Sequence, residues 1–281
     1  MRVTAGVAAA VVFALVSGAP AEETYPWLAG RAPVDSIGRG IAPPAGYVRE
    51  EAKSATFAAW LRGLPLRVGR GTVFLFDGRK KGNQKAHHRV LDIDVGKRDL
   101  QQCADAVMRL RAEFLLSQGH VKRIHFNFTS GHRADYTKWR AGYRPVVRGA
   151  EVRWVKSAQP DASYAGFRKY MNIVFAYAGT ASLARELVRV DDPKDVRVGD
   201  VYIHPGHPGH AVIVIDVAVN RRTGRRVFLL AQRFMPAQDI HVLRNPNDRA
   251  LSPWFDAAFG KTLRTPEWTF AAEELKRFGD R

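Results

Sequence analysis

Apolar residues recur at helical spacing in three segments of the chain. On residues 100–116 the apolar side chains, Cys103 among them, fall on one face, and most of the charged side chains fall elsewhere. Asp99 precedes this segment and is a natural N-cap for it. The spacing therefore predicts a helix over residues 100–116 and two further helices over residues 164–177 and 182–190.

The C-terminal half is rich in strand patterns. Residues 211–219 form a nearly unbroken apolar run, which is typical of a strand buried on both faces. Residues 220–224 (Asn-Arg-Arg-Thr-Gly) have the composition of a hairpin loop. Further strands are predicted over residues 200–203, 226–231 and 240–243. These patterns predict an α+β fold in which a helix packs on an antiparallel sheet.

The first 21 residues have the pattern of a secretory signal peptide. Arg2 is followed by an apolar stretch, and Ala19-Pro20-Ala21 fits a small-residue cleavage site. We therefore expect export to the periplasm or beyond, and a single α+β domain over residues 22–281. Residues 22–50, rich in proline and glycine, are expected to wrap this domain as an extended arm. An uncleaved anchor is the alternative, although the apolar run is short for a bilayer, and no later segment could span one.

The charge balance predicts the chemical class of the partners. The formal net charge is +17 at pH 7, in a chain whose 46% hydrophobic content is typical of a globular protein. Such a charge favours anionic partners, which in a cell envelope would be peptidoglycan, lipid headgroups or acidic polymers. No nucleic-acid partner is expected, because no zinc knuckle, recognition helix or RNP-like motif is present. The alternative is that the arginines form a solvated surface.

The chain has one cysteine, Cys103, and therefore no internal disulfide. In an exported protein this thiol is either buried and inert or retained for its reactivity. A helix N-terminus lowers the pKa of a thiol, and a nearby histidine can take its proton. His210 opens the predicted strand that follows, and this order of cysteine and histidine is the one that papain-like hydrolases use. Cys103 is thus a candidate nucleophile, and a core cysteine is the alternative.

Three glutamines are further candidates for this site. Gln232 ends a predicted strand and could orient the His210 imidazole. Gln101 and Gln102 directly precede Cys103 and are candidate donors to an oxyanion. The structural alternative is that His210 and Gln232 only satisfy backbone groups at strand ends.

Trp139 and Arg144 lie in a segment that mixes aromatic and basic side chains. Such mixtures occur in carbohydrate and phosphate sites, so both residues are candidate substrate contacts. The same residues would equally form a cation–π brace on the surface.

The loop from residue 204 to 210 contains three histidines, which are zinc-ligand types. His204, His207 and His210 are separated by Pro-Gly turns rather than held at helical spacing, so they need not converge on one point. We therefore keep a metal site only as a weak alternative and expect no cofactor.

Several longer stretches resemble a known family. They include residues 99–105 (Asp-Leu-Gln-Gln-Cys-Ala-Asp), 177–183 (Tyr-Ala-Gly-Thr-Ala-Ser-Leu), 209–214 (Gly-His-Ala-Val-Ile-Val) and 235–238 (Met-Pro-Ala-Gln). These stretches resemble the exported bacterial family called domain of unknown function 4846. The resemblance covers most of the mature chain and implies no particular activity.

A weaker resemblance links part of the chain to the NlpC/P60-type papain-like peptidases. It covers Cys103 on its helix and the region with Gly199-Asp200, His210 and Gln232. The resemblance implies a papain-like core with a helical insertion, in which these three side chains are nucleophile, base and orienting group. The sequence departs from the peptidase pattern at Gln102-Cys103-Ala104 and in the length of the insertion.

Three hypotheses about function remain open from the sequence. The first is a papain-like cysteine hydrolase that cleaves an amide or ester bond in the cell envelope. The second is a non-catalytic, cationic envelope-binding protein on the same scaffold. The third is a metal-dependent hydrolase built on His204, His207 and His210.

Overall fold

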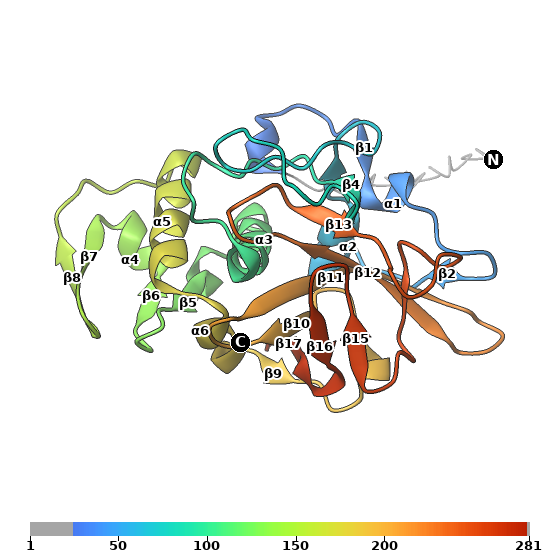
Figure 1. Ribbon diagram of the computed structural model, residues 1–281. Coiled ribbons are helices and arrows are strands. Elements are labelled where there is room, and N and C mark those ends of the chain that lie inside the picture. Colours follow the sequence, from blue (N-terminus) through green and yellow to red (C-terminus); the bar gives the residue numbers. More distant parts are fainter. Residues whose placement is uncertain (1–24, 280–281) are drawn as a thin grey trace, which may run out of the picture.

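The computed structural model describes residues 25–279, and the predicted signal peptide over residues 1–21 lies outside them. A nine-stranded sheet, antiparallel at every pairing, forms its centre (Figure 1). The strand order is β4 (His87–Val90), β13 (His241–Leu243), β12 (Arg226–Gln232), β11 (His210–Val219), β10 (Val201–His204), β17 (Leu275–Arg277) and β9 (Val188–Arg189), with β14 (Phe255–Asp256) paired to β12 and β2 (Val48–Arg49) paired to β11.

The hairpin of β11 and β12 is the longest pairing in the sheet. Ile213 pairs with Ala231 and Val214 with Leu230, and a bulge follows between Val214 and Asp216. Nine of the ten residues of β11 are buried, as the apolar run predicts. Since the strands are antiparallel, the first residue of β11 and the last residue of β12 lie at the same end of the sheet.

Helix α3 (Cys103–Ser117) covers one face of this sheet. Its residues Ala104 and Val107 belong to the same hydrophobic cluster as Ala211 and Ile213 of β11. Successive strand residues point to opposite faces, so the odd-numbered residues at the start of β11 face the helix.

The opposite face of the sheet has a core of its own. Val212, Phe228 and Phe270 belong to this second cluster. The hairpin of β15 (Thr262–Arg264) and β16 (Thr269–Ala271) covers it and lies in front of the sheet in Figure 1. The 3-10 turn η4 (Ala272–Glu274) follows this hairpin and leads into β17.

The remaining elements surround the sheet and α3. The helices are α1 (Ile37–Gly40), α2 (Phe57–Arg62), α4 (Tyr136–Arg140), α5 (Tyr164–Tyr177) and α6 (Thr180–Glu186), with 3-10 turns η1 (Pro26–Leu28), η2 (Val121–Arg123) and η3 (Pro193–Asp195). Three two-stranded sheets pair β1 (Asp35–Ser36) with β3 (Pro65–Leu66), β5 (His125–Asn127) with β6 (Arg133–Asp135), and β7 (Tyr143–Arg148) with β8 (Glu151–Lys156). Figure 1 shows the β7–β8 hairpin at the left edge, beyond α5. Helices and antiparallel sheets thus confirm the predicted α+β class.

The N-terminal segment over residues 25–50 contains only short elements. Tyr25, Leu28 and Ile37 are buried and join the cluster between α3 and the sheet. Within residues 25–279, no helix has the length and apolarity that crossing a bilayer requires.

Helix α3 begins three residues later than the spacing predicts. The N-cap is Gln102 rather than Asp99, because the Asp105 carboxylate accepts a hydrogen bond from the Gln102 amide at 2.9 Å. Asp99 instead accepts a hydrogen bond from the Ala237 amide at 2.7 Å, which ties the loop after β12 to the helix start. Cys103 is therefore the first residue of the helix.

Candidate functional site

The thiol of Cys103 lies among backbone amides at the junction of α3 and β11. Cys103 is the first residue of a 15-residue helix, and 8% of it is exposed. The amides of Cys103 and Ala104 belong to the unpaired N–H groups of the helix start, and both interact favourably with the sulfur. The third amide is that of Ala211, the residue after His210. The sulfur is thus directly adjacent to the backbone at the start of β11.

Burial keeps this thiol protonated at neutral pH. Burial and the charge of Asp105 together raise the pKa of Cys103 to about 11, although the three amides act in the opposite direction. At pH 7 roughly one thiol in ten thousand is therefore ionised. A reaction at this sulfur consequently needs a base that removes its proton.

His210 and Gln232 form a buried pair at the end of the sheet where β11 begins and β12 ends. Nε2 of His210 lies 2.9 Å from Oε1 of Gln232, and each residue is only 1% exposed. The amide nitrogen of Gln232 donates to Oε2 of Glu267 at 2.7 Å. Nζ of Lys81 donates to the same oxygen at 2.5 Å and forms an ion pair with Glu267.

This chain of contacts determines the tautomer of His210. Glu267 holds the amide nitrogen of Gln232, so the Gln232 oxygen faces the imidazole and can only accept a hydrogen bond. The proton of the neutral ring therefore lies on Nε2, which leaves Nδ1 as the basic nitrogen. Burial lowers the pKa of His210 to about 4, although the Gln232 hydrogen bond opposes this shift. The ring is thus neutral at pH 7, and its lowered pKa makes it a weaker base than an exposed imidazole.

Aromatic rings surround the His210 imidazole. Its centroid lies 4.7 Å from Phe234, 5.3 Å from Trp268 and 5.8 Å from Phe270. Phe270 belongs to the cluster on the face of the sheet opposite α3. These rings exclude water from the bond between His210 and Gln232, which strengthens it.

The structure brings Cys103 and His210 to one strand end but not into direct side-chain contact. The sulfur interacts with the Ala211 amide, whereas the imidazole packs on the face of the sheet that carries Val212. Within the described part of the chain, no hydrogen bond or ion pair joins the two side chains. The imidazole therefore leaves β11 on the face of the sheet opposite the one that α3 covers.

The two glutamines before Cys103 have structural partners. Gln101 donates to the Val95 carbonyl at 2.6 Å, and its Oε1 accepts hydrogen bonds from Arg109 at 2.8 Å and Arg233 at 2.5 Å. Both ends of this buried amide are therefore occupied within the protein. Gln102 donates to Asp99 at 3.2 Å, at the helix start. Their contacts explain how α3 is positioned, and the oxyanion role of either residue stays a prediction.

Trp139 and Arg144 form a brace in the lobe of α4 and β7. The Arg144 guanidinium stacks 3.8 Å from the centroid of the Trp139 ring and donates to the Trp139 carbonyl at 2.9 Å. Trp139 is 5% exposed and belongs to the core cluster. This geometry matches the cation–π alternative that the sequence left open.

The histidine loop does not gather a metal-ligand set. His204 lies on the exposed side, with Nδ1 2.5 Å from Oε1 of Glu274, and His207 is exposed. His210 is turned into the buried pair with Gln232. Over residues 25–279, no group of three or more His, Cys, Asp or Glu side chains converges as metal ligands would.

The structure adds three polar residues that the sequence did not single out. Glu267 and Lys81 fix the Gln232 amide, and Asp105 lies next to the thiol. The role of Asp105 could have been predicted from the sequence, because an acidic residue at the third position of a helix indicates a capping box. Glu267 and Lys81 lie in irregular segments far apart in the chain, and no local pattern links them to Gln232.

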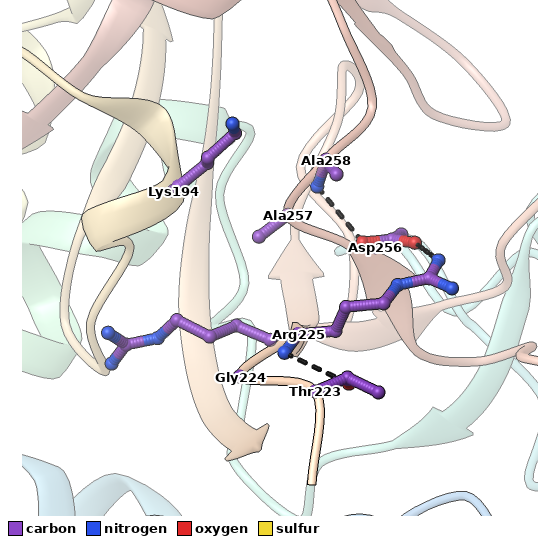
Figure 2. Close-up of a pocket in the computed structure, with 8 residues that line it drawn as sticks. Lys194, Thr223, Gly224, Arg225, Asp256, Ala257 and Ala258 are labelled. Atoms are coloured by element: carbon purple, nitrogen blue, oxygen red, sulfur yellow. Dashed lines mark hydrogen bonds and ion pairs between the residues drawn. The ribbon is translucent and has the colours of Figure 1, made fainter. Parts of the chain in front are cut away.

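A small hollow of about 240 Å³ lies at the other end of the β11–β12 hairpin (Figure 2). Arg225 forms an ion pair there with Asp256, which also accepts a hydrogen bond from the Ala258 amide at 2.9 Å. Arg226, also in its lining, pairs with Glu50, and none of the candidate site residues lines the hollow.

Comparison with known proteins identifies the family. Residues 37–277 match the sequence model of the family described as domain of unknown function (4846). The match covers most of the chain, which therefore belongs to this family. No curated protein and no solved structure matches the chain.

Proposed function

We propose that this member of the family is a cysteine hydrolase with a papain-like site, acting on an amide or ester bond. Cys103 is the nucleophile, His210 is the base, and Gln232 orients the imidazole. One observation carries the proposal: the sulfur of Cys103 meets the amide of Ala211, the residue next to a histidine whose Nε2 is bonded to Gln232. Cys103 lies more than a hundred positions before His210 and Gln232 in the chain, and the fold brings its sulfur next to the strand end that holds this pair.

Both groups are neutral at pH 7, so the proposed reaction is general-base catalysis rather than attack by a preformed thiolate–imidazolium pair. Nδ1 of His210 accepts the thiol proton as the sulfur attacks the carbonyl carbon of the substrate. The leaving amine or alcohol takes this proton from the imidazole, and a thioester remains on Cys103. Water then attacks the thioester and gives a proton to His210, and the thiol recovers this proton as the acid departs. The complete cycle of acylation and hydrolysis leaves the site as it began.

The local amides support this role. The helix N-terminus presents the amides of Cys103 and Ala104, which stabilise negative charge at the sulfur and on an adjacent oxyanion. Because the imidazole lies on the face of the sheet opposite α3, the proposal requires that His210 rearrange toward the thiol when substrate binds. The signal-like first 21 residues and the net charge of +17 favour action on an anionic component of the cell envelope.

An activated ester tests the proposal without knowledge of the substrate. We expect p-nitrophenyl acetate to release a burst of one nitrophenolate per protein and to leave an acetyl group on Cys103, located by peptide mass spectrometry. Cys103→Ala abolishes the burst. Acetylation of lysines alone, with no burst, overturns the proposal.

The second candidate function is a non-catalytic binding protein. The raised pKa and low exposure of the Cys103 thiol favour it, since an inert core cysteine has both properties. Under this alternative Cys103→Ser leaves function unchanged in cells, whereas the hydrolase proposal requires loss of function with folding intact.

A further inference from the structure

A basic cleft lies beside the C-terminal part of α3, away from Cys103. Its volume is about 570 Å³, within the range of small-molecule sites. Residues of α3, η2, β5, β6 and α6 line it, together with the chain near Phe278. Arg111 on its wall is eight residues beyond Cys103, or about 12 Å along the helix.

Cationic side chains dominate the lining of this cleft. They are Arg111, Lys122, Arg123, Arg133 and Arg185, with His125 among them. The one carboxylate in the lining, Glu186, accepts a hydrogen bond from the Asn127 amide at 2.7 Å, and burial raises its pKa. Arg133 also pairs with Asp135 at 2.7 Å. Positive charge therefore exceeds negative charge inside a concave wall, where field lines converge.

Part of the cleft is held in place by aromatic packing. The Arg111 guanidinium lies 5.1 Å from the centroid of Phe57 and 5.1 Å from that of Phe278. Such stacking fixes the planar donor group before a ligand arrives. Phe278 and Val188, which is 59% exposed, add apolar surface next to the cations.

We infer that this cleft binds a phosphate-bearing ligand. Several arginines around one cavity suit phosphate oxygens, which accept paired hydrogen bonds from a guanidinium. The adjoining apolar surface suits a ligand with a nonpolar part next to the phosphate. The ligand is either a soluble phosphate compound or a phospholipid headgroup, and the two share the same recognition chemistry. This inference stands independently of the hydrolase proposal.

Charge reversal at the rim tests the inference. Lys122 and Arg185 are exposed, so the double variant Lys122→Glu/Arg185→Glu leaves the packed core intact. The control is Arg221→Glu/Arg222→Glu, in the exposed loop between β11 and β12, with the same change in net charge. Binding of inorganic pyrophosphate is measured by calorimetry. Binding to phosphatidylglycerol vesicles is measured by flotation against phosphatidylcholine vesicles.

We expect the cleft variant to bind at least tenfold more weakly than the wild type, and the control to stay within twofold. Binding of pyrophosphate identifies a soluble ligand, and binding of vesicles alone identifies a headgroup. Equal losses in both variants would show a diffuse charge effect and overturn the inference. Absence of wild-type binding to both probes also overturns it. Thermal melting of both variants checks that the fold is unchanged.

Discussion

Nε2 of His210 lies 2.9 Å from Oε1 of Gln232, and both side chains are buried. The Gln232 amide is in turn held by Glu267, so its oxygen must face the imidazole. This relationship places the proton of the ring on Nε2 and leaves Nδ1 as the base. The orientation comes from contacts that join β11, β12 and the C-terminal region.

Loss of the Gln232 amide should slow acylation of Cys103. Gln232→Ala frees the ring to exchange tautomers, so we expect the acylation rate with p-nitrophenyl acetate to fall at least about tenfold. Nitrogen NMR of His210 should show mixed tautomers in place of one. Gln238→Ala is the matched control, because Gln238 is also buried but donates to the Pro236 carbonyl. Equal rates in both variants would refute the orienting role.

The pH dependence of alkylation should reflect the raised pKa of the Cys103 thiol. With a pKa of about 11, the rate of Cys103 modification by iodoacetamide should rise about tenfold per pH unit between pH 7 and pH 10. Stopped-flow or quenched mass spectrometry measures the profile. A plateau below pH 9 would contradict the raised pKa and indicate an ionised thiol.

Asp105 should make the protein less stable as the pH rises. Burial raises the pKa of Asp105 to about 8, from an ordinary value near 4, although the Gln102 amide and Arg233 oppose the shift. The folded state therefore keeps a proton that the unfolded state has lost, and this contribution to stability disappears as the pH rises from about 4 to about 8. Asp105→Asn should remove that slope, on the order of a few kcal/mol in total.

Urea unfolding of wild type and Asp105→Asn at pH 5 and pH 8.5 measures this difference. Other groups titrate in both proteins, so only the change between the two proteins is informative. The Asp105 charge also raises the pKa of the thiol, so Asp105→Asn should alkylate faster above pH 9. Parallel pH profiles of stability would argue against a buried, protonated Asp105.

Arg109 should be critical for stability. It is fully buried and pairs with Glu113 at 3.3 Å and with Asp94 at 2.7 Å. Arg109→Met leaves the buried Glu113 carboxylate without its cation, which should cost about 3–5 kcal/mol in the free energy of unfolding. The double variant Arg109→Met/Glu113→Leu removes both charges and should recover part of this loss. A double variant as unstable as the single one would show that packing, not charge, dominates.

Strong local patterns predicted the four neighbouring strands β10, β11, β12 and β13 of the central sheet and helix α5. The apolar run of β11 and the loop that follows it indicated the hairpin, and the spacing over residues 164–177 gave α5 with its observed bounds. The start of α3 was missed because the capping interaction between Gln102 and Asp105 outcompeted Asp99. The β15–β16 hairpin was missed because its strands are three residues each, too short to show alternation.

Only part of the candidate site could be predicted, because some of its contacts follow from strand pairing and others depend on tertiary packing. His210 and Gln232 had to meet, because they begin and end two strands joined by one hairpin. The approach of the Cys103 sulfur to Ala211 depends on how α3 crosses the sheet, which the sequence pattern does not specify. Glu267 reaches Gln232 through tertiary packing of an irregular segment, and no periodicity reports such a contact.

The rate of Cys103 acylation in wild type and His210→Gln at pH 8 tests the central claim most directly. Glutamine keeps a polar side chain at this position but cannot take the thiol proton. The proposed site predicts a fall of about a hundredfold or more in the His210→Gln variant, with an unchanged melting temperature. Equal acylation rates in the two folded proteins would contradict it and leave Cys103 as a core thiol.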